Sequence, residues 1–126
     1  MGRRGRIARA CAAALVAVPV VMSAVSPAAA AQGDIDLFAG NYSAGSGGDG
    51  GPATSAQLAG PTGVAVAADG RVFIADRFNN RIRLVGVDGT ISTAISGLSN
   101  PVDVAVDDAA GLLYFTEESF GVSRLS

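Results

Sequence analysis

The sequence predicts an all-β protein, and two observations carry that prediction. Beyond residue 31 the apolar residues fall in short bursts rich in Val, Ile and aromatic side chains, and none keeps the i, i+3, i+4 spacing for as long as a helix needs. Tight turns separate neighbouring bursts, as at Asp69-Gly70 and Asp88-Gly89, where glycine accepts the positive φ of a two-residue turn. The bursts are Ile35–Ala39, Val64–Ala67, Val72–Ala75, Ile82–Val85, Thr90–Ile95, Val102–Val106 and Leu112–Thr116.

Residues 1–31 have the order of a secretory signal peptide. Four arginines precede the uncharged stretch Ala10–Val25, and small residues follow it up to Ala31. A membrane span needs roughly 20 apolar residues, whereas this stretch is mostly alanine and is interrupted by Pro19. We therefore expect a secreted, extracellular protein with no stable membrane span, cleaved after Ala31 or one residue earlier. Arg3-Arg4 leaves twin-arginine export open, but the general secretory route is favoured because no hydrophobic pair follows.

The charge of the remaining chain excludes one class of partner. Four of the nine basic residues lie in the signal, which leaves five arginines against eleven acidic residues, a net charge of −6. Such a surface repels phosphate backbones, so nucleic acid is not expected as a partner. The chain has no His, and its one cysteine, Cys11, lies in the signal. No cofactor and no Cys or His metal site are therefore expected.

An internal repeat organises the chain after the signal. Leu58–Val66 matches Leu98–Val106 at a shift of 40 residues, and Gly70–Asp76 matches Gly111–Glu117 at a shift of 41. A period near 40 with four short strands in each unit is typical of a β-propeller blade.

These segments resemble the NHL-repeat family. The first copy is similar to the family's repeat through Leu58–Val66, Val72–Asp76 and Asn79–Arg83, and Gly48–Leu58 is similar to the lead-in of secreted bacterial members. The second copy departs from the pattern, because Glu117–Val122 stands where the family has an aspartate and an Asn-x-Arg turn. The resemblance implies a partial NHL-type β-propeller of about two antiparallel four-stranded blades.

The resemblance also implies a division of the chain. Residues 32–57 would hold the outer strand of a neighbouring blade, at Ile35–Ala39, and a glycine-rich surface loop. Residues 58–97 would form the first blade and residues 98–126 an incomplete second one, with two outer sheet faces left bare.

Propeller rings usually hold more blades than two, so we expect a truncated or fragmentary reading frame of a longer secreted propeller. The alternative is a propeller completed by self-assembly or by a second chain, the latter forming an extracellular lyase- or lactonase-like enzyme.

Five polar residues of the first blade are the candidate site. They either hold a polar ligand at a loop surface or stabilise the turn, with Asp76 accepting backbone N–H groups and Arg81 pairing with it. The structural interpretation is favoured, because these residues belong to the repeat pattern itself. The five are Asp76, Asn79, Asn80, Arg81 and Arg83.

No catalytic residue is expected. The adjacent acids Glu117 and Glu118 would point to opposite faces of a strand and could not converge on one atom. The sequence therefore predicts a non-catalytic binding or scaffold module whose partner is an extracellular protein or carbohydrate.

Overall fold

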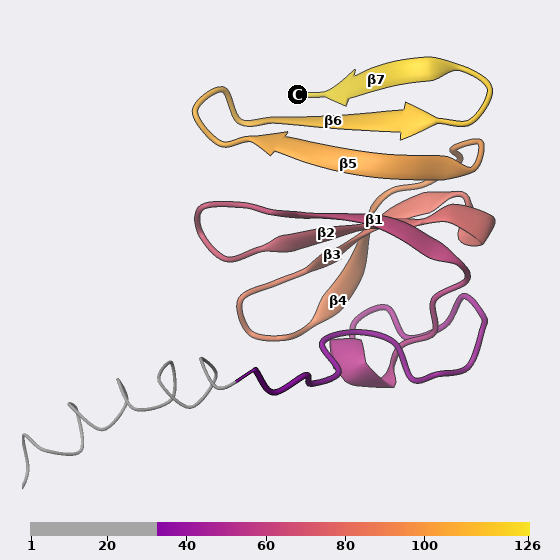
Figure 1. The fold of residues 1–126 in the computed structure, drawn as a ribbon, viewed down its shortest axis with the longest axis vertical. Coiled ribbons are helices and arrows are strands. Elements are labelled where there is room, and N and C mark those ends of the chain that lie inside the picture. Colours follow the sequence, from indigo (N-terminus) through magenta and orange to yellow (C-terminus); the bar gives the residue numbers. More distant parts are fainter. Residues whose placement is uncertain (1–32) are drawn as a thin grey trace, which may run out of the picture. The chain divides into compact units, whose positions relative to one another are not determined.

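The computed structural model describes residues 33–126, so the predicted signal peptide lies outside the described residues. The strands lie in one compact unit, Leu37–Ser126, as two antiparallel sheets (Figure 1). The first sheet contains β1 (Pro61–Val66), β2 (Val72–Asp76), β3 (Arg81–Val85) and β4 (Ile91–Ile95). The second contains β5 (Pro101–Asp107), β6 (Leu112–Glu117) and β7 (Gly121–Leu125), and two short 3₁₀ helices are η1 (Ala53–Ser55) and η2 (Arg77–Asn79).

The sheets confirm the all-β prediction and the partial propeller. In each sheet the strands are neighbours in chain order, β1-β2-β3-β4 and β5-β6-β7, so each sheet is an up-and-down blade. The first blade has four strands and the second has three. Among residues 33–126 no helix is long and apolar enough to cross a membrane.

Left-handed backbone occurs where the sequence places turn residues. Gly70 adopts a φ of 93° between β1 and β2, and Asn80 adopts a φ of 54° at the end of η2. Glycine and asparagine are the residues that tolerate this conformation best. The first turn joins β1 to β2 and the second joins β2 to β3, and each leads into an antiparallel pair.

The two blades pack face to face around one hydrophobic core. We call the face of a blade that looks toward the next blade in the chain its front face, and the opposite one its back face. The front face of the first blade buries Phe73, Ala75 and Ile82 against the back face of the second, which supplies Val104, Leu113 and Phe115.

The innermost strands β1 and β5 approach most closely. A Cβ at Gly63 would lie 2.7 Å from the Cα of Asp103, so only glycine allows this approach. Beside it, the Thr62 hydroxyl donates a hydrogen bond of 2.6 Å to the carbonyl of Val102.

A second core covers the back face of the first blade. Ile74, Val85 and Ile91 of that face pack against Ala53 and Ala56, which come from the glycine-rich residues 40–57. Figure 1 shows this segment on the side of the first blade opposite the second blade. We call residues 40–57 the cap. The expectation of two bare sheet faces is therefore wrong for this face, and the cap is a core element as well as a surface loop.

The cap also pairs with the outer edge of the first blade. Gly50 donates its N–H to the carbonyl of Ile91 at 2.8 Å, and Ile91 donates to the carbonyl of Gly51 at 3.0 Å. A bridge between Pro52 and Thr90 continues the contact. These bonds satisfy edge groups that would otherwise be open to pairing with another chain.

The structure has no strand at Ile35–Ala39, where the resemblance implies the outer strand of a neighbouring blade. A strand needs a ladder of hydrogen bonds from an adjacent strand. The neighbouring blade to which the resemblance assigns this segment is not among residues 33–126, so the assignment stays a prediction.

Candidate functional site

A buried ionic cluster lies between the first blade and the cap. Its centre is Asp76, a fully buried residue at the end of β2. One carboxylate oxygen accepts the backbone N–H of Ala59 at 2.8 Å. The other accepts the Nδ2 group of Asn79 at 2.8 Å and the Nε group of Arg81 at 3.0 Å. The Asp76 carboxylate is therefore satisfied by protein groups and has no contact with solvent.

Arg83 extends the cluster toward the cap. It is fully buried on β3, where one guanidinium nitrogen lies 2.7 Å from a carboxylate oxygen of Asp49. Another donates to the backbone carbonyl of Gln57 at 3.0 Å and lies 3.6 Å from Asp76. Asp49 and Gln57 both belong to the cap, so Arg83 links the cap to the blade.

Asp49 is held by three partners. The Thr93 hydroxyl donates to it at 2.6 Å, and Arg81 lies 3.7 Å from the same oxygen. Burial raises the pKa of Asp49, but the hydrogen bond from Thr93 and the charges of Arg83 and Arg81 outweigh it and hold the pKa below its ordinary value. Asp49 is therefore ionised at neutral pH.

The cluster unites four of the five candidate residues, namely Asp76, Asn79, Arg81 and Arg83. Asn80 lies elsewhere, at the junction of the blades, where its side-chain oxygen accepts the N–H of Asn100 at 3.0 Å. With Asp76 and Arg83 fully buried, the cluster offers no open cleft to a polar ligand. What it does is hold the cap against the blade.

Asp49 is the member that sequence reasoning missed. The structure pairs Arg83 in register with the apolar Ile74 on a buried face, which the alternation along β3 does not indicate. A buried arginine requires a carboxylate partner. Asp49 is the only acidic residue of the glycine-rich segment, residues 40–57.

The second blade carries only part of this arrangement. Glu117 accepts the N–H of Ser99 at 2.7 Å, as Asp76 accepts that of Ala59. Gly121 and Ser123 occupy the register positions that Arg81 and Arg83 occupy in the first blade. The complete cluster among residues 33–126 is thus confined to the blade that carries the cap.

Among residues 33–126 no group of three or more His, Cys, Asp and Glu side chains is arranged to hold a metal ion. The cluster also pairs each carboxylate with arginine. Its chemistry is that of a structural ion-pair network.

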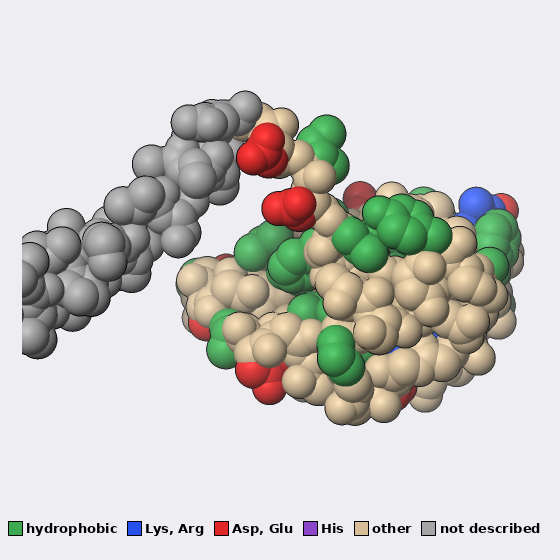
Figure 2. Space-filling view, turned by 90° about the horizontal axis from the view of Figure 1, so that it is seen from below, with side chains coloured by type: hydrophobic (Ala, Val, Ile, Leu, Met, Phe, Trp, Pro, Cys, Tyr) green, Lys and Arg blue, Asp and Glu red, His purple; other side chains and the backbone are tan. Residues whose placement is uncertain are grey.

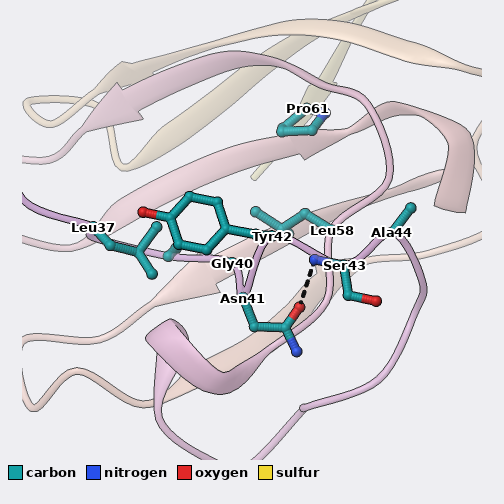
Figure 3. Close-up of a pocket in the computed structure, with 9 residues that line it drawn as sticks. Leu37, Gly40, Asn41, Tyr42, Ser43, Ala44, Leu58 and Pro61 are labelled. Atoms are coloured by element: carbon teal, nitrogen blue, oxygen red, sulfur yellow. Dashed lines mark hydrogen bonds between the residues drawn. The ribbon is translucent and has the colours of Figure 1, made fainter.

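A hollow of about 320 Å³ lies at the start of the cap (Figure 3). Its lining is mostly apolar, with Leu37 on one side and Leu58 and Pro61 on another. Tyr42 stands beside the hollow with 91% of its surface exposed. The space-filling view from this side shows hydrophobic groups separated by backbone and uncharged side chains (Figure 2).

Tyr42 has an unusual backbone conformation. Its φ of 63° lies in the left-handed region, which is uncommon for a bulky side chain and costs about 1 kcal/mol or more. A turn holds it there, in which the N–H of Ser43 donates to the Asn41 side-chain oxygen at 3.0 Å (Figure 3). The chain thus keeps an aromatic ring strained, exposed and next to an apolar hollow.

The fold resembles that of solved proteins much longer than this chain. A structural genomics protein of unknown function from Bacteroides thetaiotaomicron VPI-5482 superposes with a TM-score of 0.60 at 24% identity, over 71% of this chain and 26% of that one. Virginiamycin B lyase from Staphylococcus aureus superposes with a TM-score of 0.47 at 24% identity, over 53% of this chain and 24% of that one. The chain therefore spans about a quarter of each. A comparison with curated proteins finds no match.

The sequence matches one family model, that of the Teneurin NHL domain, over residues 39–105. The match includes the cap, the whole first blade and most of β5, and it extends over more than half of the chain. The chain therefore belongs to the NHL-repeat family.

Proposed function

We propose that the protein is a secreted, non-catalytic binding module that holds an apolar side chain of an extracellular protein at the Tyr42 hollow. One observation carries the proposal: Tyr42 is 91% exposed in a strained conformation beside an apolar hollow. A residue that contributes little to packing and costs conformational energy is better explained by contact with a partner than by the fold.

The lining of the hollow favours a protein over a carbohydrate. Sugars are bound through several hydrogen-bonding groups, whereas leucine, proline and alanine side chains dominate here. The most polar neighbour, Asn41, is engaged with Ser43 and also donates to the carbonyl of Ser55 at 3.4 Å. An apolar or aromatic side chain fits this surface better than a sugar hydroxyl.

The ionic cluster supports the proposal that the protein is non-catalytic. Its carboxylates and guanidinium groups are paired with one another under the cap, so they are not presented to a substrate. Lyase- or lactonase-like activity would need groups that a second chain brings, which is the weaker alternative.

The binding proposal predicts a specific effect at Tyr42. The protein is applied to an array of peptides that each present one aromatic or branched apolar residue, and to a glycan array. We expect binding to peptides, reduced at least tenfold by Tyr42→Ala, since the ring supplies most of the contact beside a shallow hollow. The control Phe120→Ala removes another exposed aromatic ring, far along the chain in the second blade, and should bind like the wild type.

Tyr42→Gly separates binding from folding. Glycine relieves the strain at a φ of 63°, so the free energy of unfolding should stay level or rise by about 0.5 kcal/mol while binding is lost. A large loss of stability would instead assign Tyr42 to the fold. Binding to glycans alone would change the class of partner, and binding to neither array would refute the proposal.

Secretion predicts a particular mature terminus. Because the small residues before Ala31 suit a signal peptidase, mass spectrometry of the exported protein should find a chain that begins at Gln32 or Ala31. Substituting Ala29 by a bulky residue should impair this cleavage. An intact chain that begins at Met1 in the cytosol would contradict the proposal.

A further inference from the structure

The segment that presents Tyr42 has no regular structure of its own. Residues 41–46, which we call the Tyr42 turn, contain no helix or strand, only an isolated bridge between Ala44 and Leu58. Residues 40–44 line the hollow (Figure 3), and Tyr42 among them keeps its strained φ of 63°. Such a conformation persists only when the surrounding structure holds it. The groups that hold this turn are therefore part of what forms the hollow.

The far end of the Tyr42 turn is held by two side chains of the first blade. Asn79 donates through its Nδ2 group to the backbone carbonyl of Gly45 at 2.6 Å. Arg81 donates through a terminal guanidinium nitrogen to the next carbonyl, that of Ser46, at 2.7 Å. The donors lie 34 and 35 residues along the chain from their acceptors. These two bonds therefore exist only after the cap has folded back onto the blade.

The two donors are themselves fixed by one buried carboxylate. A single oxygen of Asp76 accepts the Nδ2 group of Asn79 at 2.8 Å and the Nε group of Arg81 at 3.0 Å. Asp76 is fully buried, and the side chain of Arg81 is only 13% exposed. Asn79 has two amide N–H donors, one for Asp76 and one for the turn. Side chains that are already locked lose little rotamer freedom in a second bond, so they hold the turn at a low entropic cost.

The end of the cap closes the other side of the same segment. The backbone N–H of Gln57 donates to the carbonyl of Gly47 at 3.0 Å. The side chain of Gln57 lies so close to Gly45 that a Cβ there would collide with it. The next residue, Leu58, forms the bridge to Ala44 and lines the hollow. The Tyr42 turn is thus clasped between the end of the cap and the first blade.

We propose that Asn79 and Arg81 are positioning residues for the hollow, which hold the Tyr42 turn in its binding conformation without touching the ligand. The proposal rests on the proposed function for the ligand and on the two carbonyl bonds for the mechanism. Neither residue is among the described residues that line the hollow. Loss of either bond lets the turn relax to unstrained conformations in which the hollow is not formed. Affinity then falls in proportion to the fraction of molecules that remain competent to bind.

Two substitutions remove one anchor each. Asn79→Leu is similar in shape but has no donor, so it leaves the carbonyl of Gly45 unpaired. Arg81→Gln places its Nε2 group where the arginine has Nε, so it can keep the bond to Asp76 while the bond to Ser46 is lost. Should Arg81→Gln fail to fold, Asn79→Leu carries the same test, because Asn79 is uncharged and only half-buried.

The matched control is Asn80→Gly, one residue along the same turn of the blade. Glycine accepts the φ of 54° at this position and removes a side-chain bond of 3.0 Å to Asn100, at the junction of the blades. Backbone amide NMR relaxation of the free proteins measures the order of residues 42–44. We expect their order parameters to fall from about 0.85 to below about 0.6 in both anchor variants and to stay at the wild-type value in the control.

Binding kinetics distinguish positioning from contact. The peptide that the wild type binds best on the array is immobilised, and association and dissociation are followed by surface plasmon resonance. Each anchor variant should associate at least about fivefold more slowly, because fewer molecules are competent, while its dissociation rate stays within about twofold of the wild type. Tyr42→Ala removes the contact itself, so it should instead dissociate faster.

Three results would overturn the proposal. They are unchanged order parameters in both anchor variants, an association rate that stays at the wild-type value, and a loss of affinity that arises from faster dissociation. An Asn80→Gly control that loses order or affinity equally would also overturn it, since the effect would then be a general loosening of the blade. A wild type that binds no peptide would refute the proposed function alone, and the relaxation data would still decide whether Asn79 and Arg81 hold the Tyr42 turn.

Discussion

Replacement of Arg83 by methionine is expected to lower the free energy of unfolding by about 3 to 5 kcal/mol, which is the cost of removing one partner from a buried ion pair. Methionine is of similar length and apolar, so little packing is lost. The loss instead comes from Asp76, which stays fully buried with fewer positive partners, and from the cap, which loses the contact between Asp49 and the blade. Urea unfolding followed by circular dichroism measures it.

Arg71→Met is the matched control. Arg71 also pairs with an aspartate, Asp69, at 2.7 Å, but the two side chains are 46% and 55% exposed. Exposed pairs contribute about 0 to 1 kcal/mol, so this variant should unfold close to the wild type. If the two substitutions lowered the free energy of unfolding equally, burial would not be what makes the cluster stabilising.

Replacement of Gly63 by valine is expected to cost about 3 kcal/mol, the upper range for overpacking a core. A Cβ at this position would meet the Oδ1 atom of Asp103, and it would lie 2.7 Å from the Cα of the same residue and 3.0 Å from the carbonyl oxygen of Val102. Backbone atoms cannot rotate out of the way. The blades must separate, and the shared core of Phe73 and Phe115 then loses contact.

Ala105→Val tests the same addition on the innermost strand of the second blade. Ala105 is exposed on the front face, where no described residue covers it. A change within about 0.5 kcal/mol is expected. If Gly63→Val unfolds like this control, the close approach of β1 and β5 is not required for the fold.

The sequence predicted the strands and turns because these depend on neighbouring residues. Alternating apolar residues, the Asp-Gly turns and the 40-residue period place six of the seven strands correctly, from β1 to β6. The aligned repeats also placed Glu117 at the position of Asp76, and both accept a backbone N–H at the start of their blade. Local pattern alone was sufficient for these features.

The sequence was misleading where glycine is abundant. A segment such as the cap has no periodicity, so it resembles a surface loop in any local pattern. Its burial depends on two alanines that fit against Ile74 and Ile91 after the chain has folded back. Likewise, Arg83 alternates with apolar neighbours as an exposed residue would, yet it is fully buried.

The sequence by itself therefore predicted the family and the succession of strands in each blade. Only the tertiary structure decided which faces are covered. Thr93 and Asp49 lie 44 residues apart and meet at 2.6 Å because the cap returns across the back of the first blade. Such pairings depend on how the chain folds over a finished sheet, and alternation along a strand carries no information about them. The same fold leaves Tyr42 exposed beside its hollow.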